Sequence, residues 1–181
     1  MAPSPSSRTK VFISYSHADK EWLDRLKRHL KPMVREGRLD CWDDTRIQPG
    51  ADWQQEIRHA LDAAQVAVLV ISADFFASDF IATDELPPLL AAAKAEGVLI
   101  LPVIISASRF ARTPSLARFQ AVNSPDRPLA KMPPAEQDDV LDYVAQIIEN
   151  PQQPPRISWT LRRGGLWMCP HNRPIQIAAG C

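Results

Sequence analysis

The sequence predicts an α/β fold: a flavodoxin-like, doubly wound parallel sheet of about five strands in the order 2-1-3-4-5, with helices on both faces. Apolar, strand-like runs alternate with segments of helical spacing through residues 10–150. The runs at 66–71 and 98–105 are continuously apolar, which is typical of parallel strands buried on both faces. Right-handed crossover connections leave few other topologies for such an alternation.

The first part of the chain alternates strand and helix twice. Residues 10–15 and 39–42 are short runs of strand-forming residues, while residues 43–50 are polar and end in a Pro-Gly pair, which indicates a loop. One helix is predicted before Gly37, and a second after Asp52, which is a plausible cap. The apolar positions at helical spacing are Trp22, Leu23, Leu26, Leu30 and Val34 in the first helix, and Trp53, Ile57, Ala60, Leu61 and Ala64 in the second.

The second part repeats the alternation. The strand at 66–71 is followed by a Pro-Pro pair and a helical run at 89–95, and proline costs little in a first helical turn. The strand at 98–105 comes next. A segment rich in Ser, Arg and Pro then holds the candidate fifth strand at 119–123, and helical spacing returns over 135–148.

One domain is predicted over residues 10–150, between a flexible N-terminus at 1–9 and a Pro-rich linker with a basic tail at 151–181. The tail holds four basic residues and no acid, which leaves 17 basic and 21 acidic residues before it. This mildly acidic body argues against a nucleic-acid partner. With no apolar run of membrane-spanning length, no secretory signal and only three cysteines, a cytoplasmic protein without a membrane span is expected.

The topology predicts where a ligand would bind. In an open doubly wound sheet, ligands bind beyond the carboxyl ends of the strands, where the strand order reverses; here that is between the first and third strands. Residues 14–17 end the first strand, residues 71–74 end the third, and Glu85 lies on the segment that leaves the third. The same polar residues are also expected as helix caps, with Ser16 or Asp19 capping the first helix.

Three segments, in this order, resemble the TIR (Toll/interleukin-1 receptor) domain family, in its bacterial NADase type. They read KVFISYSH at 10–17, WDDTRIQPG at 42–50 and SDFIATDELP at 78–87, and the resemblance extends over about residues 8–150. It implies an enzyme that cleaves the nicotinamide–ribose bond of NAD+, giving nicotinamide and ADP-ribose or a cyclic ADP-ribose. The catalytic glutamate would be Glu85.

The resemblance also implies a substrate pocket. Residues 43–52 look like the family's mobile BB loop, which gates the pocket and makes TIR–TIR contacts, and Thr45 would lie near the nicotinamide end. Some NADase members have a tryptophan shortly before the glutamate, where Phe80 and Ile81 stand here. The substrate-binding residues that the resemblance and the topology together indicate are Phe12, Ser14, Tyr15, Ser16, His17, Asp43, Thr45, Arg46, Trp53, Ser78, Phe80 and Ile81.

The residues favour NAD+ as a substrate over NAD as a redox cofactor, so no cofactor is expected. None of the six glycines forms a GxGxxG or Walker loop that would hold a dinucleotide in the Rossmann manner. The nicotinamide of NAD+ is a cationic pyridinium that departs neutral, so one carboxylate can suffice where ordinary glycosidases need two. A helix start would favour ionised Glu85 by about 0.3–1 kcal/mol. Whether that carboxylate attacks the ribose or only stabilises its charge stays open, and a glutamate that merely satisfies backbone N–H groups is the simpler alternative.

Partners and rival functions follow from the same resemblance. It implies self-association through TIR–TIR contacts, a separate sensor protein or activating ligand, and a role as an anti-phage, abortive-infection effector. No metal site is expected, because Asp43 and Asp44 have no His or Cys cluster beside them. Two alternatives remain: a non-catalytic TIR interaction module, including one that interferes with host TIR signalling, and a nucleoside hydrolase or transferase on a similar sheet.

Overall fold

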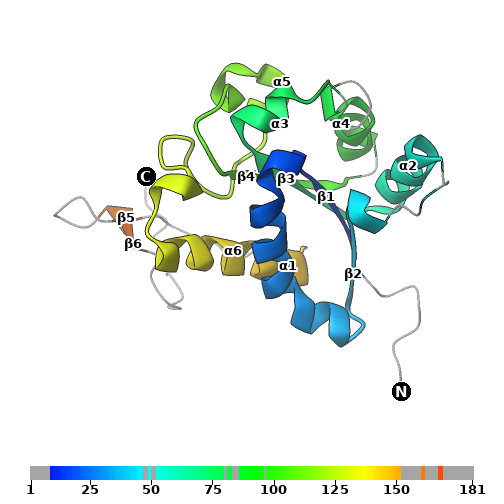
Figure 1. The fold of residues 1–181 in the computed structure, drawn as a ribbon, viewed down its shortest axis with the longest axis horizontal. Coiled ribbons are helices and arrows are strands. Elements are labelled where there is room, and N and C mark those ends of the chain that lie inside the picture. Colours follow the sequence, from blue (N-terminus) through cyan, green and yellow to red (C-terminus); the bar gives the residue numbers. More distant parts are fainter. Residues whose placement is uncertain are drawn as a thin grey trace, which may run out of the picture.

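The computed structural model describes residues 9–46, 49, 52–79, 81–82, 86–95, 97–151, 160–161 and 167–168 (Figure 1). Thr9 already belongs to the first strand, and the rest of the predicted flexible N-terminus lies outside these residues. In the tail, Thr160–Leu161 (β5) and Trp167–Met168 (β6) pair antiparallel. Among the described residues, no helix combines the length and the apolar character needed to cross a bilayer.

Four parallel strands form the central sheet, in the order β2-β1-β3-β4. They are β1 (Thr9–Ser14), β2 (Leu39–Trp42), β3 (Val66–Ile71) and β4 (Leu99–Ile104). The chain builds outward from β1 to β2, then crosses to the other side of β1 and builds outward through β3 to β4. The order therefore reverses between β1 and β3, which confirms the predicted doubly wound topology and its switch point.

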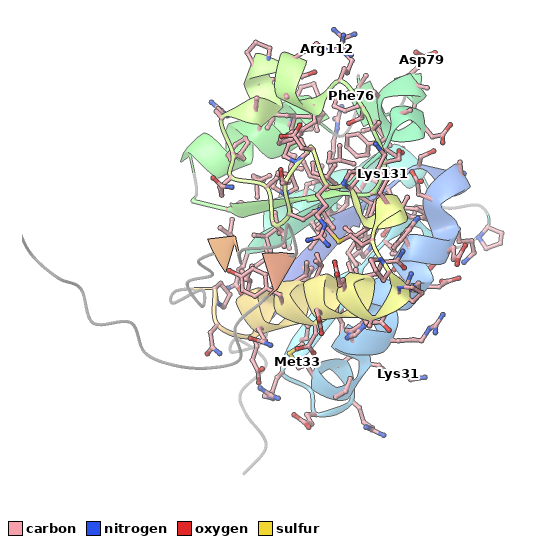
Figure 2. All side chains as sticks on the ribbon, turned by 90° about the vertical axis from the view of Figure 1, so that its left-hand side faces the viewer. Lys31, Met33, Phe76, Asp79, Arg112 and Lys131 are labelled. Atoms are coloured by element: carbon pink, nitrogen blue, oxygen red, sulfur yellow. The ribbon has the colours of Figure 1, made fainter. Side chains whose placement is uncertain are left out.

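Strands β1, β3 and β4 are buried on both faces, and their alternate residues belong to two separate cores. On one face, Val11 and Val68 join a cluster that includes residues of α1 (Lys20–Arg35) and α6 (Pro134–Glu149). In Figure 2 the yellow helix α6 runs across the blue helix α1, and Arg25 Nη2 of α1 donates to Asp138 Oδ1 of α6 at 2.6 Å. Helical cover on this face matches the prediction.

Helices also cover the opposite face of the sheet (Figure 1). Strand residues such as Phe12 and Leu69 pack there in a second cluster with residues of these helices. The helices are α2 (Trp53–Ala63), α3 (Ala73–Ala77), α4 (Leu86–Ala95) and α5 (Pro114–Ala117). The sheet is thus enclosed on both sides, as its continuously apolar strands require.

The helix ends follow local sequence chemistry. Asp52 caps α2, since its Oδ1 accepts from Gln55 N at 3.3 Å. Helix α1 ends as predicted at Gly37, which has a φ of 71°, a conformation that glycine adopts without strain. Asp19 occupies the N-cap position of α1, one of the two predicted capping positions, but its side chain makes no capping bond to the helix backbone.

The predicted fifth strand at 119–123 does not form. Val122 N donates to Pro102 O at 2.8 Å, and the buried Asn123 side chain takes the place of a strand partner. Its Oδ1 accepts from Ile104 N, and its Nδ2 donates to Ile104 O, both at 2.9 Å. Within a strand, the N and O of one residue face the same side, so the Pro102 nitrogen also faces this edge. Without an N–H there, a regular fifth strand would lose a ladder bond.

Candidate functional site

Side chains from the ends of β1 and β2 meet at the carboxyl edge of the sheet. Tyr15 follows β1 and donates its hydroxyl to Asp44 Oδ1 at 2.6 Å. The His17 ring, at the start of the short 3-10 turn η2 (His17–Asp19), donates Nε2 to Asp44 Oδ2. Asp44 begins a similar turn after β2, η3 (Asp44–Arg46). One carboxylate therefore ties the start of the loop to the end of the neighbouring strand.

The environments of Tyr15 and His17 differ sharply. Tyr15 is buried, whereas the His17 side chain is 82% exposed. Burial raises the pKa of Tyr15 above its ordinary range, and the bond to Asp44 and the charges of Asp44, Asp43 and Asp24 raise it further. Tyr15 is therefore a neutral donor at physiological pH and cannot serve there as a base.

We expect the Tyr15 hydroxyl to remain protonated beyond the ordinary tyrosine pKa of about 10. Because the chain has two tyrosines, the Tyr143→Phe variant leaves Tyr15 as the sole phenol in an alkaline absorbance titration. Because the pKa of Tyr15 is higher in the folded protein than in the unfolded chain, protonated Tyr15 stabilises the fold. This contribution is fully present below the ordinary tyrosine pKa and is lost as the pH rises toward the folded-state pKa. Adding Asp44→Asn should bring the titration to lower pH. If Tyr15 ionises at the ordinary tyrosine pKa in the Tyr143→Phe variant, where Asp44 is intact, its pKa is not raised by burial and Asp44.

Asp43 anchors the base of the same loop. It is 0% exposed, and Lys27 of α1 donates Nζ to its Oδ2 at 2.9 Å. Thr45 donates its backbone N at 3.2 Å, and also its hydroxyl, to Oδ1. Burial alone would raise the pKa of Asp43, but the bonds from Thr45 and Lys27 outweigh it and hold the pKa below its ordinary value. Asp43 is thus an ionised structural anchor with both oxygens engaged.

Arg46 folds back over β2. Its Nη1 donates to Asp40 Oδ1 and to Cys41 O, both at 2.8 Å. Together with Asp43 and Thr45, it fixes the first turn of the predicted BB-like loop against the sheet. Residues 47–48 and 50–51 of that loop lie outside the described residues.

The ends of β1 and β3 are joined by a buried pair. Ser72 follows β3 and donates its hydroxyl to Asp19 Oδ2 at 2.5 Å, while its oxygen accepts from Phe75 N at 2.9 Å. Burial raises the pKa of Asp19, the Ser72 bond acts in the opposite direction, and the charge of Asp74 raises it again, so the net shift is upward. The topological switch point therefore contains a desolvated carboxyl group.

The remaining predicted substrate-binding residues divide into three groups. Phe12, Ser14 and Ile81 are buried, and Phe12 stacks on Trp42 with ring centroids 5.2 Å apart. Ser16 precedes η2 at the strand end, and Ser78 Oγ accepts from Ile81 N at 3.3 Å. Glu85, Phe80 and the side chain of Trp53 lie outside the described residues.

The site thus brings Tyr15 and His17, at the end of β1, together with Asp44 at the base of the loop. Three functional-site candidates were missed: Asp44, Asp19 and Lys27. Asp44 follows β2, whose carboxyl end must lie beside that of β1, so strand order was the available signal. Nothing in the local sequence indicated the long-range bonds of Asp19 and Lys27. Among the described residues, no group of three His, Cys, Asp or Glu side chains is arranged to hold a metal ion.

The fold, the switch-point site and the sequence motifs agree with a family comparison. The family model for the TIR domain matches residues 11–132, and the chain belongs to the TIR domain family. The match begins within β1, includes the Tyr15–Asp44–His17 cluster and extends beyond β4. The residues that build the described site are therefore the residues of the TIR domain itself.

The chain is similar in sequence to a curated protein and in fold to a solved structure. The uncharacterized protein y4lF of Sinorhizobium fredii (strain NBRC 101917 / NGR234) is 29% identical over 138 residues, covering 76% of this chain and 42% of that protein. The chain therefore spans about two fifths of that relative's length. Among solved structures, the TIR domains of the activated Roq1 resistosome directly recognizing the pathogen effector XopQ share 19% identity, with a TM-score of 0.43 and coverage of 76% of this chain and 83% of that chain.

Proposed function

We propose that this TIR domain is an NAD+ glycohydrolase that cleaves the nicotinamide–ribose bond, with Glu85 as the catalytic carboxylate. The products are nicotinamide and ADP-ribose or a cyclic ADP-ribose. The observation that carries the proposal is the position of Glu85 in the sequence. It stands on the segment leaving β3, directly before Leu86 at the start of α4, in a chain whose sheet reverses order between β1 and β3.

The surroundings of the switch point support a polar substrate. Tyr15, Ser16 and His17 follow β1, and the Asp44 carboxylate lies against two of them. These groups supply hydroxyl, imidazole and carboxylate functions at one edge of the sheet, which suit the hydroxyl-rich riboses of a dinucleotide. Since the described strand ends carry no glycine-rich phosphate loop, the proposal treats NAD+ as a substrate that is consumed.

The chemistry requires one anion at the reacting ribose. Nicotinamide leaves NAD+ as a neutral molecule, so no acid has to protonate it, and positive charge builds up on the ribose as the bond breaks. A carboxylate beside that charge lowers the barrier, either by direct electrostatic stabilisation or by attack on the anomeric carbon. Water then completes the hydrolysis, or a second nucleophile within the substrate closes a cyclic product.

We further propose that assembly controls the activity. The TIR domains would associate through the loop at 43–52, with a sensor protein or a ligand as the trigger, and NAD+ depletion in the bacterial cytoplasm would abort phage infection. The support is family membership, together with a loop whose first turn is fixed by Asp43 while the loop continues beyond Arg46.

The test compares NAD+ with NADH over a range of protein concentrations, with nicotinamide release measured by chromatography. We expect release from NAD+ at a rate per molecule that rises with protein concentration. NADH should be inert, because dihydronicotinamide is not a cationic leaving group. Faster cleavage of simple nucleosides than of NAD+ would favour a nucleoside hydrolase, and no release even under crowding would favour an interaction module.

A further inference from the structure

A buried hydrogen-bonded relay crosses the switch point. Asp19 lies at the end of η2 and is 8% exposed, and Ser72, 53 positions later, is 1% exposed. The Ser72 hydroxyl donates to Asp19 and accepts from the backbone N of Phe75. One carboxylate from the β1 side therefore holds the residue that caps α3 on the β3 side.

The relay continues into the segment that leads to Glu85. Helix α3 ends at Ala77, and the next residue, Ser78, accepts a bond from Ile81 N at 3.3 Å. Phe75 and Ile81 are both buried in the core beneath this segment. The described residues 72–79 and 81–82 are thus joined by hydrogen bonds and anchored in the core through Phe75 and Ile81. Ser72 fixes the first turn, and Asp19 in turn orients Ser72.

We propose that Asp19 is a positioning residue, which sets the placement of residues 72–79 and 81–82 at the switch point and, through this segment, the turnover that depends on Glu85. The role of Asp19 toward Glu85 rests on the proposed function. The role of Asp19 toward residues 72–82 depends only on the relay.

The hydrogen bond from Ser72 to Asp19 does more than support the cap of α3. Asp19 stands at the N-cap position of α1 but makes no capping bond there, and its carboxylate is directed instead at Ser72. A serine can cap a helix without a carboxylate beside it, so the bond from Ser72 to Asp19 serves to hold the Ser72 hydroxyl in its capping orientation. The arrangement places a desolvated carboxyl group near a second acid, Asp74, which opposes its ionisation. Such a cost is expected where buried polar groups specify one arrangement of two elements.

Loss of the carboxylate frees the Ser72 hydroxyl to rotate and loosens the first turn of α3. Small misplacements of a reacting group lower turnover by about 10- to 100-fold. The binding groups after β1 and β2 stay in place, because Tyr15, His17 and Asp44 bond to one another and not to the relay. The expected signature is therefore a fall in kcat of about 10- to 100-fold, with KM nearly unchanged.

The experiment uses the full chain with Asp19→Ala, Asp19→Asn, Ser72→Ala and the Asp19→Ala/Ser72→Ala double variant. Asp24→Ala is the matched control, because it removes an aspartate of the adjacent helix α1 whose ion pair with Lys20 is exposed. Hydrogen exchange by mass spectrometry reports on peptides within 72–82 and, for comparison, on α6. Nicotinamide release from NAD+ gives kcat and KM at a temperature where all the variants are folded by circular dichroism.

The relay predicts faster exchange in residues 72–82, but not in α6, for Asp19→Ala and Ser72→Ala. It also predicts a kcat loss that is non-additive in the double variant and is largely restored in Asp19→Asn, whose amide oxygen can still accept from Ser72. Unchanged exchange in 72–82, or an unchanged kcat in Asp19→Ala, would overturn the proposal. If the wild type releases no nicotinamide, the proposed function fails while the exchange measurement still decides whether Asp19 positions this segment. If Asp19→Ala does not fold, Asp19→Asn and Ser72→Ala carry the test.

Discussion

Glu85→Gln is expected to lower nicotinamide release from NAD+ by about 100- to 1,000-fold, the range typical for removing one group that stabilises transition-state charge. Glutamine keeps the size and polarity of the side chain but has neither the negative charge nor the nucleophilic oxygen. The variant should therefore still fold and still bind NAD+. The measurement is steady-state release of nicotinamide, together with binding of NAD+ by calorimetry.

The control separates the catalytic role from a helix-start role. Glu56 is an exposed glutamate in the first turn of α2, so Glu56→Gln removes a carboxylate from the start of a helix. We expect Glu56→Gln to leave turnover within about twofold, because a surface helix-dipole contact contributes only about 0.3–1 kcal/mol to stability and nothing to the chemistry. Equal turnover by Glu85→Gln and the wild type would remove Glu85 from the reaction.

Phe12→Ala should lower the free energy of unfolding by about 3–5 kcal/mol, as usual for large-to-small changes at buried aromatic residues. Phe12 is 1% exposed and lies in the middle of β1, in register with Trp42 of β2 and Ala67 of β3. Its ring stacks on Trp42 at an interplanar angle of 12°. Alanine would leave a cavity at the centre of one core, where neither the strands nor α2 can close it.

Urea unfolding followed by tryptophan fluorescence measures this change. Val34→Ala is the matched control, since Val34 is 43% exposed on α1, and we expect it to alter stability by no more than about 0.5 kcal/mol. A Phe12→Ala protein with wild-type stability but weakened NAD+ binding would show instead that Phe12 acts as the substrate contact that the sequence indicated.

Much of the fold was readable from the sequence because each element carries its own signal. The run at 66–71 is apolar at every position, and all six residues are buried in β3. Glycine at position 37 marked the end of α1, and Asp52 the start of α2. Such signals depend on neighbours within a few residues, and the constraint against left-handed crossovers then supplies the order of the strands.

The fifth strand failed for a reason that local patterns do not contain. Residues 119–123 have strand-forming character, but Pro102 on the neighbouring strand faces them without an N–H to share. Asn123 instead satisfies Ile104 with its side chain. Two segments pair only if the free edge of the partner strand offers the backbone N–H and C=O groups that the new strand needs. Which residues of β4 face that edge is fixed only in the assembled sheet.

The sequence by itself determined the fold class, the TIR motifs and the meeting of the β1 and β3 ends. Hydrophobic periodicity identifies each strand and helix locally, and right-handed crossovers then fix the order of the strands. It also singled out Glu85, whose role stays a prediction. Only the tertiary structure decided that Asp43 is a buried anchor held by Lys27, that Asp44 ties Tyr15 to His17, and that Asp19 bonds to Ser72 and not to its own helix. These polar side chains have several alternative partners nearby in the chain. For the buried carboxylates Asp43 and Asp19, desolvation settles the choice, because a buried carboxylate has to accept from whatever donor the packing brings within reach.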